Sequence, residues 1–126
     1  MIAHHSMQRA GIRVLAARML QKPAARYDFE REAAELGLSY SRFRRIFSEE
    51  LDCPPARYLT RARMRHAALE LKRCEDSLAA VAHRIGMTDP YHFSRLFKRH
   101  MGVPPDNFRR RQKHRFRHRK DTHAPR

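Results

Sequence analysis

The chain has 126 residues, with 28 Lys and Arg against 13 Asp and Glu, so its formal net charge is +15 with neutral histidines. This length suits one domain or two very small ones and excludes a large multidomain enzyme. A hydrophobic content of 41%, with 7 Phe and 4 Tyr, is close to that of globular proteins and excludes a fully disordered basic protein.

The positive charge is unevenly distributed. Residues 109–126 hold nine Lys and Arg against one acid, a net +8, and the other 108 residues carry 19 basic and 12 acidic side chains, a net +7. Both parts attract polyanions, and nucleic acid is the favoured partner because each neutralised phosphate releases a condensed counterion. A membrane surface is the weaker alternative. No stretch of the sequence approaches the roughly 20 apolar residues that a membrane span needs.

The first predicted element is an amphipathic helix over residues 11–20. Upstream of it and within it, arginines interrupt any apolar run that could serve as a signal-peptide core, and the two cysteines show no metal or redox spacing. We therefore expect a cytoplasmic protein. The apolar positions of this helix are Ile12, Leu15, Ala16, Met19 and Leu20.

Two helices joined by a short turn follow. The first begins after Asp28 as N-cap and ends before Gly37, which supplies the left-handed conformation of a helix C-cap. Ser39 then caps the second helix, whose apolar positions follow the spacing i, i+3, i+4, i+8. These positions are Phe43, Ile46, Phe47 and Leu51.

A long helix is predicted over residues 55–73. At a rise of 1.5 Å per residue it is roughly 27 Å long, enough to hold two small lobes side by side. The side chains available for packing are Tyr58, Leu59, Ala62, Ala67, Leu69 and Leu71.

The same order of N-cap, glycine and second N-cap then occurs again along the chain. Ser77 caps a short helix, Gly86 ends it, and Asp89 caps the next helix with Pro90 at the first helical position. The apolar positions of that helix are Phe93, Leu96, Phe97 and Met101. A last helix starts at Pro104–Pro105 and is anchored through Phe108.

The returning signals reflect an internal repeat. The segment FRRIFSEELDCPPARY (43–58) aligns with FSRLFKRHMGVPPDNF (93–108) at a shift of 50 residues. Repeats of this period indicate duplicated supersecondary units. In each unit a Gly-containing turn joins two helices, and the second helix has one apolar stripe and one basic face. This pattern predicts two helix-turn-helix units in an all-α chain of about seven helices.

The second helix of a helix-turn-helix enters the major groove of DNA and turns the side chains of its first turns toward base edges. Arg suits this task because its planar fork donates two hydrogen bonds to guanine O6 and N7. The predicted base contacts are Tyr40, Ser41, Arg44, Arg45, Tyr91, His92 and Arg95. The predicted phosphate contacts are Ser39, Arg42, Arg57, Arg61, Ser94, Lys98 and Arg109, with Arg63 and Arg65 as further candidates.

The segment RIGMTDPYHFSRLFKRHMGVPPDNFR (84–109) resembles the signature of the AraC/XylS family of bacterial transcription regulators, and RMRHAALEL (63–71) fits the same pattern. The resemblance covers about residues 10–111. It implies a seven-helix, homeodomain-like DNA-binding domain with two helix-turn-helix subdomains joined by a long linker helix. It also implies a transcription regulator on the bacterial nucleoid, usually an activator that contacts RNA polymerase.

Two positions depart from the family pattern: Asp52 stands where the first unit often has Gly, and Pro90 starts the second DNA-reading helix. Most family members also carry a separate ligand-binding or dimerisation domain. The chain is therefore either a stand-alone regulator, similar to the short multiple-antibiotic-resistance and superoxide-response activators, or the C-terminal piece of a longer one. A small-molecule effector is expected only in the second case.

The predicted organisation has four parts. They are a first helix-turn-helix subdomain (8–53), a linker helix (54–73), a second helix-turn-helix subdomain (74–111) and a basic tail (112–126). Two interpretations of the tail stay open, a disordered, solvated extension and an auxiliary phosphate contact.

The remaining signals favour neither an enzyme nor a metal protein. The chain has no nucleophile elbow, Walker loop, dinucleotide fingerprint or paired carboxylates. His114 and His118 are four residues apart and His4 and His5 adjoin, but a structural zinc site needs about four N or S ligands, and Cys53 and Cys74 fall in different predicted subdomains. We expect no cofactor. The competing function is that of a nonspecific architectural or RNA-associated protein whose basic segment 109–120 supplies the affinity.

Overall fold

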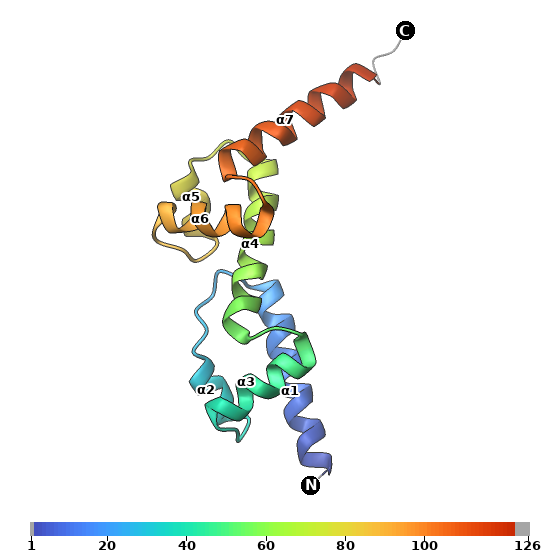
Figure 1. Ribbon diagram of the computed structural model, residues 1–126, viewed down its shortest axis with the longest axis vertical. Helices are drawn as coiled ribbons and strands as arrows, with labels where there is room; N and C mark the ends of the chain where they lie inside the picture. Colours follow the sequence, from blue (N-terminus) through green and yellow to red (C-terminus); the bar gives the residue numbers. More distant parts are fainter. Residues whose placement is uncertain (1, 123–126) are drawn as a thin grey trace. The chain divides into compact units, whose positions relative to one another are not determined.

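The computed structural model describes the backbone of residues 2–122 and the side chains of residues 5–113. Seven helices and no strand occur in this range (Figure 1), which confirms the predicted all-α architecture. The helices are α1 (Ile2–Gln21), α2 (Phe29–Glu35), α3 (Tyr40–Leu51), α4 (Pro55–Arg73), α5 (Leu78–Arg84), α6 (Pro90–Met101) and α7 (Pro105–Thr122). None of the described helices is both long and apolar enough to cross a lipid bilayer.

The four predicted N-caps start the four helices of the two helix-turn-helix motifs. Asp28 accepts a hydrogen bond from the backbone N–H of Arg31 at 3.2 Å, and Ser39 accepts one from Arg42 at 3.2 Å. Ser77 and Asp89 do the same for Ala80 and Tyr91 at 3.1 and 2.9 Å. Each cap satisfies one of the backbone donors that a helix N-terminus leaves open.

The turns inside the two motifs have the same geometry. Gly37 follows α2 with φ 71°, and Gly86 follows α5 with φ 88°, a region that glycine enters without the steric penalty of a Cβ atom. The residue after each glycine donates its backbone N–H back into the helix, Leu38 to Ala33 O and Met87 to Ala82 O, both at 2.9 Å. The predicted helix-turn-helix repeat is confirmed at the level of individual hydrogen bonds.

The chain divides into two compact units, unit 1 (residues 1–63) and unit 2 (residues 64–126). In unit 1, α1 and α2 pack against α3, and the core is centred on Phe43 and Phe47, which are fully buried. The ring of Tyr58 meets Phe47 edge-on, with 5.5 Å between centroids. In unit 2, α6 packs against α5 and α7 around the buried rings of Phe93 and Phe97.

The helix α4 contributes to both cores. Leu59, in its first half, belongs to the core of unit 1, whereas Met64, Ala67 and Leu71 belong to the core of unit 2. The segment predicted as a separate linker, residues 54–73, is therefore divided between the two units, because its apolar side chains pack into whichever core lies beside them.

The N-terminal helix is longer than predicted. It begins at Ile2 rather than at residue 11, since residues 2–10 contain no helix breaker, and a polar side chain on the inner face obscures their helical pattern. That side chain is Gln8, which is buried and donates to Leu36 O at 3.2 Å. Gly11 allows close packing here, because an added Cβ would lie 2.4 Å from a Leu36 methyl carbon.

Three apolar side chains that are predicted to pack are instead exposed. Leu20 and Leu69 are 51% and 47% exposed, and Met101 at the end of α6 is also exposed. Leu20 and Leu69 each lie about 100° or more around the helix from the centre of the nearest buried stripe, so apolar character alone does not place them in the core, whereas Met101 is the last residue of its helix.

The helix α7 continues to Thr122, whereas one interpretation of residues 112–126 is a disordered extension. Lys, Arg and Gln, which dominate this segment, lose little side-chain freedom in a helix, and no Pro or Gly interrupts it before that point. Residues 123–126 lie outside the described part of the chain.

The turn after α3 places a non-glycine residue in the left-handed region. Asp52 has φ 63° and caps α3, at the position where unit 2 has Gly102 with φ 85°. Asp52→Gly is expected to stabilise the protein by about 0.5–1 kcal/mol, because glycine removes the Cβ clash of this conformation and only part of that gain is offset by the flexibility of glycine in the unfolded chain. Urea unfolding measures the change.

The reciprocal variant, Gly102→Asp, is the control for that prediction. An added Cβ at Gly102 meets no atom within 4 Å, so the backbone conformation alone sets its effect. Gly102→Asp should lose stability by a similar amount. A loss of stability in both variants would show that Asp52 contributes a side-chain interaction that outweighs its strained backbone.

Ion pairs join α1 to the C-terminal end of α3 in unit 1. Arg9 contacts Glu49 and Glu50, both at 2.8 Å, and Arg13 contacts Glu50 at 3.0 Å. The hydrogen bonds from Arg9 and then Arg13 hold the pKa of Glu50 below its ordinary value of 4.5. Because the folded-state pKa is lower, the stabilisation is fully present above about pH 4.5 and is lost as the pH falls through the folded-state pKa.

Glu50→Gln is therefore expected to weaken the dependence of stability on pH in the acid range, since glutamine has no carboxyl group to protonate. Urea unfolding of the variant and of the wild type at a series of pH values below about 6 measures this. Glu35→Gln, in an exposed pair with Arg31 on α2, is the matched control and should leave the acid dependence close to that of the wild type. Identical curves for wild type and Glu50→Gln would contradict the assignment.

Candidate nucleic-acid interface

The first turns of α3 form a basic surface over the core of unit 1. Phe43, Ile46 and Phe47 are buried on the inner side of the helix. The helical spacing places the intervening side chains outward, and all of them are exposed. These exposed side chains are Tyr40, Ser41, Arg42, Arg44 and Arg45, four of which are predicted base contacts.

The helix α6 presents the corresponding surface in unit 2. Phe93 and Phe97 are buried, and Tyr91, at 76% exposure, is the most exposed large apolar side chain described. His92, Arg95 and Lys98 are also exposed, while Ser94 is half-buried. The predicted base contacts of each helix therefore lie together on its exposed side, over the buried phenylalanine rings.

The positive charge on these surfaces is not neutralised within the protein. Among the side chains that the structure describes, none of the Arg and Lys residues of α3 and α6 forms an ion pair with an acid. The ion pairs that the structure describes involve basic residues elsewhere, such as Arg18, which contacts Glu32 at 2.9 Å. The Arg and Lys residues of α3 and α6 are Arg42, Arg44, Arg45, Arg95, Lys98 and Arg99. They can approach an anion without first breaking an internal pair.

The arginines of α4 have different environments. Arg57, Arg61 and Arg65 are exposed, as phosphate contacts require. Arg63 instead donates to the backbone oxygens of Pro23 at 2.8 Å and Ala25 at 3.1 Å, and burial lowers the pKa of its guanidinium. Its prediction as a phosphate contact is corrected, because these bonds hold the loop between α1 and α2 in unit 1.

The side chain of Arg109, in α7, is half-buried. Its Nε and Nη2 atoms are buried and have no hydrogen-bond partner in the part of the chain that the structure describes. The side chain lies near Glu75, whose pKa is lowered first by a hydrogen bond from Lys113 and in smaller part by the charge of Arg109. Arg109 therefore lies beside the loop between α4 and α5, and its role as a phosphate contact stays a prediction.

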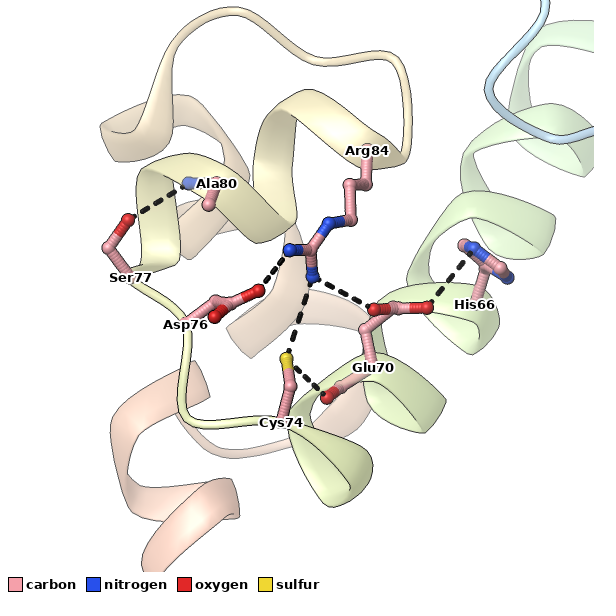
Figure 2. A network of polar contacts seen from close by, with 7 residues as sticks. All are labelled: His66, Glu70, Cys74, Asp76, Ser77, Ala80 and Arg84. Carbon is pink, nitrogen blue, oxygen red and sulfur yellow. Dashed lines mark hydrogen bonds and ion pairs between the residues drawn. The ribbon is translucent and has the colours of Figure 1, made fainter.

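A polar network that the sequence did not indicate joins α5, the loop between α4 and α5, and the end of α4 (Figure 2). Arg84, at the end of α5, contacts Asp76 and donates to Glu70 at 3.1 Å and to the Cys74 sulfur at 3.6 Å. Cys74 Sγ donates to the backbone oxygen of Glu70 at 3.2 Å. The hydrogen bond with Asp76 is the main cause that raises the pKa of Arg84 and lowers that of Asp76. The network ties α5 to the end of α4.

Cys53 and Cys74 are both free thiols. No group of three or more His, Cys, Asp or Glu side chains gathers as a metal site within residues 5–113. Three histidines that the sequence analysis considers as metal ligands have side chains outside that range: His4, His114 and His118.

Comparison with known proteins agrees with this geometry. A family model described as a helix-turn-helix domain matches residues 33–111. The chain is 32% identical, over 92 residues, to an uncharacterised HTH-type transcriptional regulator of Haemophilus influenzae, an alignment that covers 73% of this chain and 31% of that protein. The chain spans less than a third of the length of the curated relatives it matches.

Two solved structures are similar in fold. The DNA-binding domain of AdpA, described as a global transcriptional factor and solved in complex with a target DNA, has a TM-score of 0.76 and 26% identity, covering 82% of this chain and 94% of that one. A probable AraC family transcriptional regulator from Rhodopseudomonas palustris has a TM-score of 0.72 and 20% identity, covering 82% of this chain and 97% of that one. The chain therefore belongs to the AraC-type helix-turn-helix family of transcriptional regulators, which are not enzymes.

Proposed function

We propose that this chain binds double-stranded DNA sequence-specifically, with α3 and α6 each entering one major-groove segment. The observation that carries the proposal is the pair of exposed, unneutralised basic surfaces on the second helices of two helix-turn-helix motifs. Such helices read base edges with their first turns. The DNA complex of the similar AdpA domain supports the same class of ligand.

The proposed contacts divide into two sets. Base edges are read by residues that reach outward from the first two turns, with arginine donating to guanine. These residues are Ser41, Arg44 and Arg45 on α3 and Tyr91, His92 and Arg95 on α6, and Tyr40 belongs to the same surface. Phosphates are met by side chains at the helix starts and on the outer side of α4 and α6. These are Ser39, Arg42, Arg57, Arg61, Ser94 and Lys98, together with Arg109 near the start of α7.

The two groove segments are proposed to be successive, about 34 Å apart on one face of the duplex. The reading residues of α3 and α6 differ, so a single chain selects an asymmetric site rather than a palindrome. We propose further that DNA binding occurs at the nucleoid in the cytoplasm, and that the bound regulator activates transcription by contacting RNA polymerase. A small-molecule effector enters only through a sensor domain of a longer protein.

Competition binding tests the proposed function against nonspecific polyanion binding. A labelled duplex containing a selected site is bound at ~150 mM salt and competed with unlabelled random duplex. A sequence-specific regulator should prefer its site by ~10³-fold or more, because base contacts add to the phosphate contacts that all duplexes share. Equal competition by random duplex or by RNA would instead support the nonspecific basic binder.

The basic tail is expected to add affinity without sequence preference. Deleting residues 112–126 should weaken binding to cognate and random duplexes by a similar factor and flatten the dependence of log Kd on log salt, because fewer counterions are released. Salt titrations of both duplexes with both proteins measure this. A deletion that changes the preferred sequence would contradict a role limited to phosphates.

A further inference from the structure

The first two turns of α3 contain a contact between two outward side chains. The guanidinium carbon of Arg44 lies 5.8 Å from the centroid of the Tyr40 ring, within the range of a cation–π interaction. The residues are four apart, so both project from the same side of the helix. Both are also exposed, and Tyr40 retains 40% of its accessible surface.

The inner face of the Tyr40 ring packs against the core of unit 1. It stacks on Phe43 with 6.4 Å between centroids and an interplanar angle of 21°, and Phe43 is fully buried and stacks in turn on Phe29. A ring packed against the core has little freedom to turn toward a DNA base. Its outer face is instead a fixed platform for the guanidinium.

The second unit has no equivalent of this pair. At the repeat shift of 50 residues, Pro90 takes the place of Tyr40 and Ser94 takes the place of Arg44. Tyr91, the neighbouring aromatic residue of α6, is 76% exposed and has no ring partner among the residues that the structure describes. Tyr91 and Arg95 of α6 are also four residues apart, but of the two helices only α3 has an arginine–ring contact among the residues that the structure describes.

We propose that Tyr40 is a positioning residue that orders the Arg44 guanidinium for guanine recognition, rather than a base contact of its own. The inference rests on the proposed DNA-binding function. A free arginine side chain loses many rotamers when it binds, and the ring reduces that loss by limiting them beforehand. The interaction uses the flat face of the guanidinium, so its in-plane N–H groups stay available to donate to guanine O6 and N7.

A double-mutant cycle tests this coupling. Kd is measured for wild type, Tyr40→Leu, Arg44→Met and the double variant on a duplex that the wild type prefers. Tyr40→Leu should weaken binding about 2- to 5-fold, as expected for an exposed cation–π pair, and should have no further effect once Arg44 is replaced. Tyr40→Phe keeps the ring and should bind like the wild type. Tyr91→Leu, the matched control, should be additive with Arg44→Met.

The free protein supplies a second readout that needs no DNA. Ring-current shifts of the Arg44 δ protons in NMR spectra should be present in the wild type and in Tyr40→Phe and absent in Tyr40→Leu, with all three proteins folded by thermal melting. Additive losses in the cycle, or a loss in Tyr40→Phe equal to that in Tyr40→Leu, would overturn the inference and make Tyr40 a direct contact. Failure of the proposed function shows differently, as a wild-type protein without any preferred duplex.

Discussion

Arg45→Ala and Arg95→Ala are each expected to weaken binding to the cognate duplex by about 1–3 kcal/mol and to relax base choice in one part of the site. The two residues hold equivalent places in the repeat, are exposed on α3 and α6, and have no internal acid partner among the described side chains. In the proposed role, each variant loses a bidentate donor to guanine, which discriminates that base from the others. Binding to a panel of single-base site variants measures both effects.

Arg31→Ala is the matched control for these variants. Arg31 lies on α2, outside the proposed reading helices, and its exposed pair with Glu35 adds little stability. It removes the same charge and should change Kd only slightly and equally on all duplexes. If Arg45→Ala or Arg95→Ala weakens cognate and random duplexes equally, the residue contacts phosphate and does not read a base.

Phe97→Ala is expected to have the largest effect on folding, a loss of about 3–5 kcal/mol in the free energy of unfolding. Phe97 is fully buried and packs edge-on to Phe93 and Phe108, with centroids 5.8 and 5.4 Å away. Truncation removes the transfer free energy of the ring and leaves a cavity between α6 and α7. Urea unfolding measures the loss.

Tyr91→Ala on the same helix gives the comparison, since its ring is 76% exposed. That variant should change the free energy of unfolding by less than about 0.5 kcal/mol. A loss below about 1 kcal/mol in Phe97→Ala would show that the ring is not the centre of the unit 2 core.

The features that the sequence predicts well are local ones. A helix N-cap, a left-handed glycine and a phenylalanine at positions i and i+4 act through neighbours a few residues away, so the roles of Asp28, Ser39, Gly37 and Gly86 follow from the residues around them. Each of these local features occurs in both motifs, which supports the assignment of the same turn in each. The exposed faces of α3 and α6 follow from the same periodicity.

The roles of individual arginines could not be predicted in this way. Arg57 and Arg63 have the same chemistry on the same helix, yet one is exposed and the other binds two backbone oxygens of a loop about 40 residues earlier. The long, flexible side chain reaches whatever acceptor the tertiary fold brings near. Arg109 and Arg84 likewise acquire their environments from the loop between α4 and α5, which no local pattern encodes.

Selection of binding sites from a random duplex library determines whether one chain reads two successive groove segments with two different helices. We expect the selected duplexes to share one asymmetric site with two blocks whose centres are about 10 base pairs apart, the first altered by Arg45→Ala and the second by Arg95→Ala. A single short block, a palindrome, or a library that stays random after selection would contradict it.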